Sequence, residues 1–133
     1  MLKVDIQADS KFPVDRKAIR KRIAEVLLRL GVDEAVRVSV SVVGDRKMQT
    51  LNKQYRKKDY TTDVLSFPTK DPSQEIADEK FFHSEEIGVV LGDIVVSHPQ
   101  AVLTASRRNE MLDVIVCDLV EHGMLHLLGY HHD

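Results

Sequence analysis

Residues 36–55 read VRVSVSVVGDRKMQTLNKQY, and this stretch decides the fold. Valine occupies every second position at its start and alternates mainly with polar residues, which is the period of a half-buried β-strand. Gly44 and Asp45 then predict a turn, with Asp45 placed to cap a helix that continues to about Tyr55. A strand that leads directly into a helix predicts a fold of the α/β class.

The chain before this stretch predicts another strand and another helix. Leu2, Val4 and Ile6 alternate with charged or polar residues, as in a half-buried strand. Asp15 opens a segment whose apolar residues recur at helical spacing, and Gly31 is a natural helix end. The first half of the chain is therefore expected to run strand, helix, strand, helix.

Two apolar runs after this stretch predict strands with no helix between them. Residues 64–67 form a short run that Pro68 stops, and residues 69–86 are mostly polar and predict a long loop. Residues 87–96 are rich in valine and isoleucine, and Gly92-Asp93 within them predicts a turn into a mostly buried strand. Because these strands are consecutive, we expect a small mixed sheet of about four strands.

Residues 97–128 predict two helices. Ser97-His98-Pro99 is typical of a helix start, since proline is tolerated in the first turn, and the break between the helices is expected at residues 107–109. With 133 residues, the chain predicts a single domain over residues 1–133. Its fold class is α/β (α+β), with a mixed sheet packed against helices and a metal site on the C-terminal helix.

The composition excludes several classes of protein. The chain is 43% apolar and 30% charged, as expected for a globular domain, and a formal net charge of −2 excludes a strongly basic chain. No run approaches the ~20 apolar residues of a membrane span, and the single cysteine, Cys117, cannot form an internal disulfide. We therefore expect a cytoplasmic protein without membrane contact, in which any nucleic-acid contact comes from a local patch.

The last twelve residues contain a pattern of histidines that predicts a metal site. His122 and His126 are four residues apart in an apolar helix, so both imidazoles share one face and are expected to point where core residues would. Gly129 permits a turn that brings His132 back beside them. We assign the third ligand to His132 rather than to His131, because adjacent residues rarely aim at one point.

Three neutral imidazoles suit a tetrahedral ion whose fourth position is open to water. The predicted cofactor is therefore one zinc ion, although other divalent transition metals also accept imidazole ligands. Structural zinc sites usually fill all four positions, often with cysteine, and Cys117 points to a different side of the helix. A simpler interpretation is a buried histidine whose hydrogen bonds are satisfied within the core, and it applies better to a lone residue. His83 and His98 are expected to be structural or exposed.

The spacing of His122, His126, Gly129 and His132 resembles the metzincin peptidase signature at four positions. Peptidases of that kind carry a glutamate base directly after the first histidine, where this chain has Gly123. Glu121 precedes the histidine and would point about 100° away around the helix. The missing base argues against peptide hydrolysis.

A closer resemblance is to the YbeY family of metal-dependent endoribonucleases, which act in bacterial ribosomal RNA maturation. It rests on HGMLHLLGYHH (122–132), on LNKQYR (51–56) with TDVLSFP (62–68), and on LGDIV (91–95). The family usually has aspartate where His131 stands. Its members usually continue into a helical tail, so we expect part of the wall of the site to be missing from this sequence.

The resemblance implies that Arg56 is the basic catalytic residue facing the metal. Its guanidinium fork suits phosphate oxygens and could stabilise a transition state that gains negative charge. We therefore expect a single-strand-directed endoribonuclease that performs metal-assisted phosphodiester hydrolysis. Its expected partner is RNA, in the form of ribosomal RNA or the ribosome. No general base is identified, and Asp63 and Asp93 are expected to be structural.

Other interpretations remain open at this point. The chain could be another metallohydrolase, or a non-catalytic ribosome-associated protein whose metal braces the C-terminal helix. A second basic group on the first predicted helix is either the solvent-exposed face of that helix or a surface that attracts RNA phosphates. That group consists of Arg16, Lys17, Arg20, Lys21 and Arg22. Oligomeric state cannot be read from the sequence.

Overall fold

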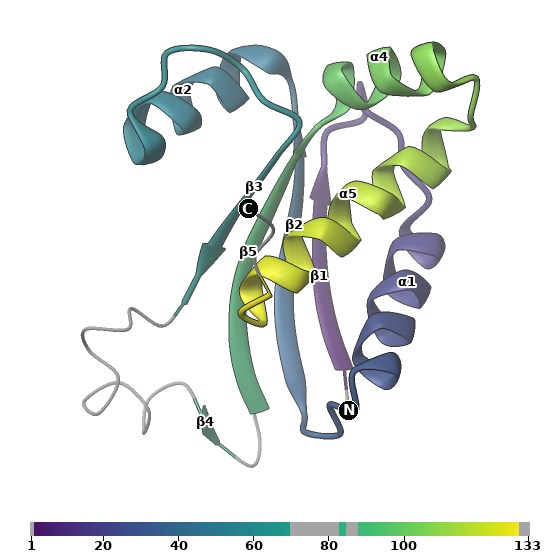
Figure 1. Cartoon of the computed structure of the whole chain (residues 1–133), viewed down its shortest axis with the longest axis vertical. Helices are drawn as coiled ribbons and strands as arrows, with labels where there is room; N and C mark the ends of the chain where they lie inside the picture. Colours follow the sequence, from purple (N-terminus) through teal and green to yellow (C-terminus); the bar gives the residue numbers. More distant parts are fainter. Residues whose placement is uncertain (1, 70–82, 85–87, 131–133) are drawn as a thin grey trace.

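A computed structural model of the chain describes residues 2–69, 83–84 and 88–130 (Figure 1). Its strands are β1 (Leu2–Ala8), β2 (Val36–Val43), β3 (Val64–Pro68), β4 (His83–Ser84) and β5 (Gly88–Ser97). They form one sheet in the order β1-β2-β5-β3, with β4 pairing to β5 off this path. β1, β2 and β5 run parallel, whereas β3 and β4 are antiparallel to β5. The predicted mixed sheet is confirmed.

The helices in these ranges are α1 (Arg16–Arg29), α2 (Asp45–Arg56), α4 (His98–Arg108) and α5 (Leu112–Leu127). Asp15 caps α1, because its carboxylate accepts a hydrogen bond from Ala18 N at 3.0 Å. Asn109 adopts a left-handed conformation and separates α4 from α5 where the break was predicted. None of these helices reaches the combination of length and low polarity that a bilayer span needs.

The two faces of the sheet carry different cores. Helices α1 and α5 cross one face, as Figure 1 shows, and the alternate valines of β2 pack there with Ile94 and Val96 of β5. Helix α2 packs on the other face through Met48, which meets Leu65 and Val95. The period of two in the strands therefore separates a large core from a small one under α2.

The predicted turn at Gly92-Asp93 is wrong, because β5 continues through both residues. The pairing of β2 with β5 shifts register between Arg37 and Val38, beside Gly92, whose φ is 143°. A Cβ on Gly92 would overlap the carbonyl oxygen of Phe67. The glycine therefore allows a bulge in β5 and the close approach of β3, rather than a turn.

The predicted capping role of Asp45 is also wrong. Gly44 is the N-cap of α2, and Asp45 is the first helical residue. One carboxylate oxygen of Asp45 accepts hydrogen bonds from Thr61 at 3.1 Å, Ser97 at 3.0 Å and Gln100 at 3.2 Å. It ties together α2, the chain before β3 and the start of α4.

Only part of the loop predicted over residues 69–86 can be compared with the structure. Within it, β4 is a short strand, and residues 70–82 and 85–86 lie outside the described ranges.

Candidate functional site

Helix α5 carries the two predicted metal ligands that fall within the described residues. His122 is exposed and His126 is half-buried, so the expectation that both imidazoles point into the core is wrong. The side of α5 that carries both histidines faces a cleft beside β3. The two rings lie on successive turns, with centroids 4.5 Å apart.

Gly123 sits between the sheet and the two histidines. It is buried, and a Cβ at this position would press on the side chain of Ile94 in β5. The backbone of α5 therefore runs close against the sheet where the imidazoles leave it.

Arg56 is the last residue of α2 and is exposed. The helix ends there because Lys57 turns the chain with a left-handed φ of 59°. Asn52, which is fully buried, donates a side-chain hydrogen bond to the carbonyl of Tyr60 at 2.8 Å. This bond holds the loop that leads from Arg56 into β3.

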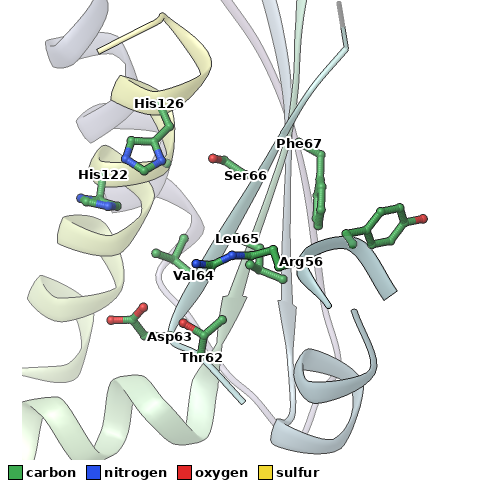
Figure 2. Close-up of a pocket in the computed structure, with 11 residues that line it drawn as sticks. Arg56, Thr62, Asp63, Val64, Leu65, Ser66, Phe67, His122 and His126 are labelled. Carbon is green, nitrogen blue, oxygen red and sulfur yellow. The ribbon is translucent and has the colours of Figure 1, made fainter. Parts of the chain in front are cut away.

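One cleft of about 540 Å³ joins these elements. Its lining comes from the end of α2, the approach to β3 with β3 itself, and α5: Tyr55, Arg56, residues 62–67, His122, Gly123 and His126. Figure 2 shows Arg56 extending to Val64, toward the side of the cleft that carries the two imidazoles. Three of the four predicted site residues thus line one cavity.

Asp63 lines this cleft, although the sequence assigned it a structural role. Its backbone does brace the fold, because the carbonyl accepts a hydrogen bond from Ser97 N at 2.9 Å. Its side chain is exposed and belongs to the cleft lining. Asp93 is exposed on β5 and is absent from that lining. The two aspartates therefore differ, and Asp63 supplies a carboxylate to the site.

Ser66 also lines the cleft, and sequence reasoning missed it. Val64 and Ser66 share the face of β3 that meets α5, whereas Leu65 and Phe67 pack under α2. Figure 2 shows the Ser66 hydroxyl directed toward the helix that carries His126. The alternation within residues 62–67 contained this signal, since a polar residue on the helix-covered face is unusual.

Glu121 lies outside the cleft lining and binds helix α1. Its carboxylate accepts hydrogen bonds from Arg22 at 3.3 Å and from Arg29 at 3.4 Å. Arg22 also donates to Asp118 at 2.9 Å, and this bond is the main cause that raises the pKa of the Arg22 guanidinium. Arg22 is therefore engaged in ion pairs and does not belong to an exposed basic surface. The other members of the predicted basic group are exposed: Arg16, Lys17, Arg20 and Lys21.

The remaining candidates divide between the core and the C-terminal residues outside the described ranges. Cys117 is 5% exposed, and burial raises the pKa of its thiol. His98 starts α4 and packs on Phe12, with ring centroids 5.2 Å apart, as expected of a structural histidine.

His131 and His132 lie outside the described residues, so the third metal ligand stays a prediction. Within residues 2–69, 83–84 and 88–130, no three His, Cys, Asp or Glu side chains gather closely enough to hold a metal.

Comparison with known proteins gives consistent matches. The family model described as endoribonuclease YbeY matches residues 5–133. A protein named endoribonuclease YbeY from Anaeromyxobacter sp. is 35% identical over 131 residues, covering 96% of this chain and 62% of the relative. Its namesake from Aquifex aeolicus is 38% identical over 125 residues, covering 92% and 73%. This chain therefore spans less than two thirds of the Anaeromyxobacter relative.

One solved structure has the same fold. The solution structure of a Thermotoga maritima protein aligns with a TM-score of 0.58 and 24% identity, covering 100% of this chain and 75% of that chain.

Proposed function

The chain belongs to the endoribonuclease YbeY family, and on that premise we propose that it is a metal-dependent endoribonuclease that cleaves single-stranded RNA in ribosomal RNA maturation. The observation that carries this proposal is the single cleft lined by Arg56, His122 and His126. A guanidinium that can bind two phosphate oxygens in the same cleft as two imidazoles is a combination that suits phosphodiester hydrolysis. RNA, and the ribosome as its source, are the proposed partners.

We propose zinc as the cofactor, held by His122, His126 and His132. The donor set fits, because two neighbouring imidazoles are common zinc ligands and no cysteine lines the cleft that would favour a closed structural site. When bound, the ion would supply Lewis-acid stabilisation of a phosphate oxygen and activation of water. Other divalent transition metals remain compatible with this donor set.

Arg56 would bind and orient the phosphodiester. It is exposed at the mouth of the cleft and extends toward the imidazoles, so its guanidinium can hold two phosphate oxygens through parallel hydrogen bonds. Charge stabilisation of this kind usually contributes strongly to catalysis. Asp63 and Ser66 add a carboxylate and a hydroxyl to the same lining.

Two competing functions find less support. A metzincin-type peptidase needs a glutamate at position 123, where even a Cβ would press on Ile94 and force the core to shift. A metal that only braces α5 does not require an open cleft of about 540 Å³ next to its ligands. Cytoplasmic location is proposed because the proposed substrate is ribosomal RNA and because the free thiol of Cys117 suits a reducing compartment.

The test compares Arg56→Ala with Lys58→Ala. Both positions are exposed, and Lys58 is close in sequence but absent from the cleft lining. Single-turnover cleavage of a single-stranded RNA should fall about 100-fold or more in Arg56→Ala, with unchanged metal content, and should stay near the parent rate in Lys58→Ala. Unchanged cleavage in Arg56→Ala would remove Arg56 from the mechanism.

A further inference from the structure

A second groove opens on the face of the sheet that carries α2. Its volume is about 670 Å³, and it lies where the parallel strands β1 and β2 end. The floor is apolar, with Val43, Leu51 and Val95 among its residues. Two cations, Arg16 and Lys47, belong to its lining. The carboxyl ends of parallel strands are a common place for ligands in α/β sheets.

The charge of this groove is positive. Lys47 is exposed and forms no ion pair with any residue that the structure describes. Arg16 is anchored by a hydrogen bond to the carbonyl of Ile6 at 2.6 Å, which fixes its guanidinium over the end of β1. Asp9 is the acidic residue of the lining, and its carboxylate already accepts a hydrogen bond from Lys11 N at 3.0 Å. The groove therefore suits an anion.

Helix α2 connects this groove to the histidine cleft. Lys47, Leu51 and Tyr55 are spaced four residues apart and so lie along one stripe of α2. Leu51 lines the groove, and Tyr55 lines the cleft. Tyr55 is 59% exposed, and its ring meets Phe67 with centroids 4.9 Å apart. The stripe of α2 that begins in the groove therefore ends in an exposed aromatic ring at the cleft.

The spacing along this stripe suits a strand of nucleotides. Eight residues of α-helix cover about 12 Å, and a strand whose phosphates are ~3.4 Å or more apart crosses that distance in about two to four nucleotides. Proteins that hold single strands combine a positive groove with aromatic rings on which bases stack. The chemistry of this stripe matches that combination.

We propose that the α2 groove, the cavity lined by Arg16, Lys47 and Leu51, binds single-stranded RNA on one side of the cleavage position. Lys47 and Arg16 contact phosphates, and Tyr55 stacks a base as the strand enters the cleft. This inference rests on the proposed function, because the strand it describes is the substrate of that cleft. It predicts that the affinity for RNA increases with the length of the strand, which binding in the cleft alone would not produce.

The test compares Lys47→Ala with Lys53→Ala. Both lysines are exposed on α2, and both substitutions remove one charge from a helix that tolerates alanine. Lys53 lines neither the groove nor the cleft. The probes are 2′-O-methyl oligouridylates of about two and about ten nucleotides, a range that brackets typical single-strand site sizes. Binding to the metal-loaded chain is measured by fluorescence anisotropy over a series of salt concentrations.

Lys47→Ala should weaken binding of the longer strand about three- to tenfold more than Lys53→Ala does, and should reduce its salt slope by ~0.7. The ratio of long-strand to short-strand affinity should fall only in Lys47→Ala. Equal effects of the two substitutions, in a chain that still binds and cleaves RNA, would overturn the α2 groove and leave the proposed function standing. Failure of the unsubstituted chain to bind or cleave any RNA would overturn both.

Discussion

Gly123 lies so close to Ile94 that a Cβ on the glycine would stand 2.8 Å from Cγ2 of the isoleucine. Ile94 is fully buried in the centre of the sheet, so it has little freedom to move away. The contact brings the backbone of α5 down onto β5 directly beside His122. It also explains why this chain keeps a glycine where a metzincin-type peptidase keeps its catalytic glutamate.

Gly123→Ala should destabilise the chain by up to about 2 kcal/mol, because an overpacking cost of up to about 3 kcal/mol exceeds the ~1 kcal/mol that alanine gains over glycine inside a helix. The measurement is the free energy of unfolding in urea. Ile94→Ala removes the clashing atoms, so it should cost less in the Gly123→Ala background than in the parent. Additive costs in the double variant would contradict the contact.

Asp45→Ala should lower the free energy of unfolding by about 2–3 kcal/mol. It removes the acceptor shared by three side chains, and Ser97 is fully buried, so its hydroxyl would lose a partner. RNA cleavage should also decrease, since Thr61 leads into the cleft residues. Asp59→Ala is the control, because its pair with Lys53 at 3.8 Å is exposed and contributes ~1 kcal/mol at most. Equal costs for the two aspartates would refute the role of Asp45.

Cys117 should react slowly with a disulfide reagent in the folded chain. Burial raises the pKa of its thiol above the usual value, so at a given pH less of the reactive thiolate is present than in the unfolded chain. At pH 8 we expect a rate at least about tenfold lower than in urea. The same shift predicts a contribution to stability that is fully present below the ordinary thiol pKa and is lost as pH rises through the raised pKa of the folded chain. Equal reaction rates with and without urea would show that the thiol is accessible.

Local patterns predicted most of the elements. The valine alternation of β2, the cap at Asp15 and the break at Asn109 each depend on a few neighbouring residues, and all three are found in the structure. The order of strands predicted the mixed sheet, because two consecutive strands without a helix between them favour an antiparallel pair.

The errors arose where distant residues decide the outcome. Gly92 looked like a turn because the reasons for a glycine there lie on other strands, in the register shift against β2 and in the close approach of Phe67 in β3. Asp45 looked like a cap because its partners, Ser97 and Gln100 among them, lie far along the chain.

The site shows the same difference between features that neighbouring residues decide and features that distant residues decide. The spacing of His122 and His126 was readable from the sequence, and the role of Arg56 came from the resemblance to a family. The cleft that joins them depends on how β3 packs between α2 and α5, so Asp63 and Ser66 could be recognised as cleft residues only in three dimensions.

The most direct test is cleavage of single-stranded RNA by the zinc-loaded chain, measured together with metal content and beside two variants purified in the same way. His126→Ala removes a proposed ligand, and His98→Gln alters a histidine outside the cleft, with folding of each followed by circular dichroism. We predict one bound ion and RNA cleavage for the parent and for His98→Gln, and loss of both in a folded His126→Ala. Undiminished cleavage by His126→Ala, or no cleavage by a parent that holds its metal, would contradict a metal-dependent endoribonuclease.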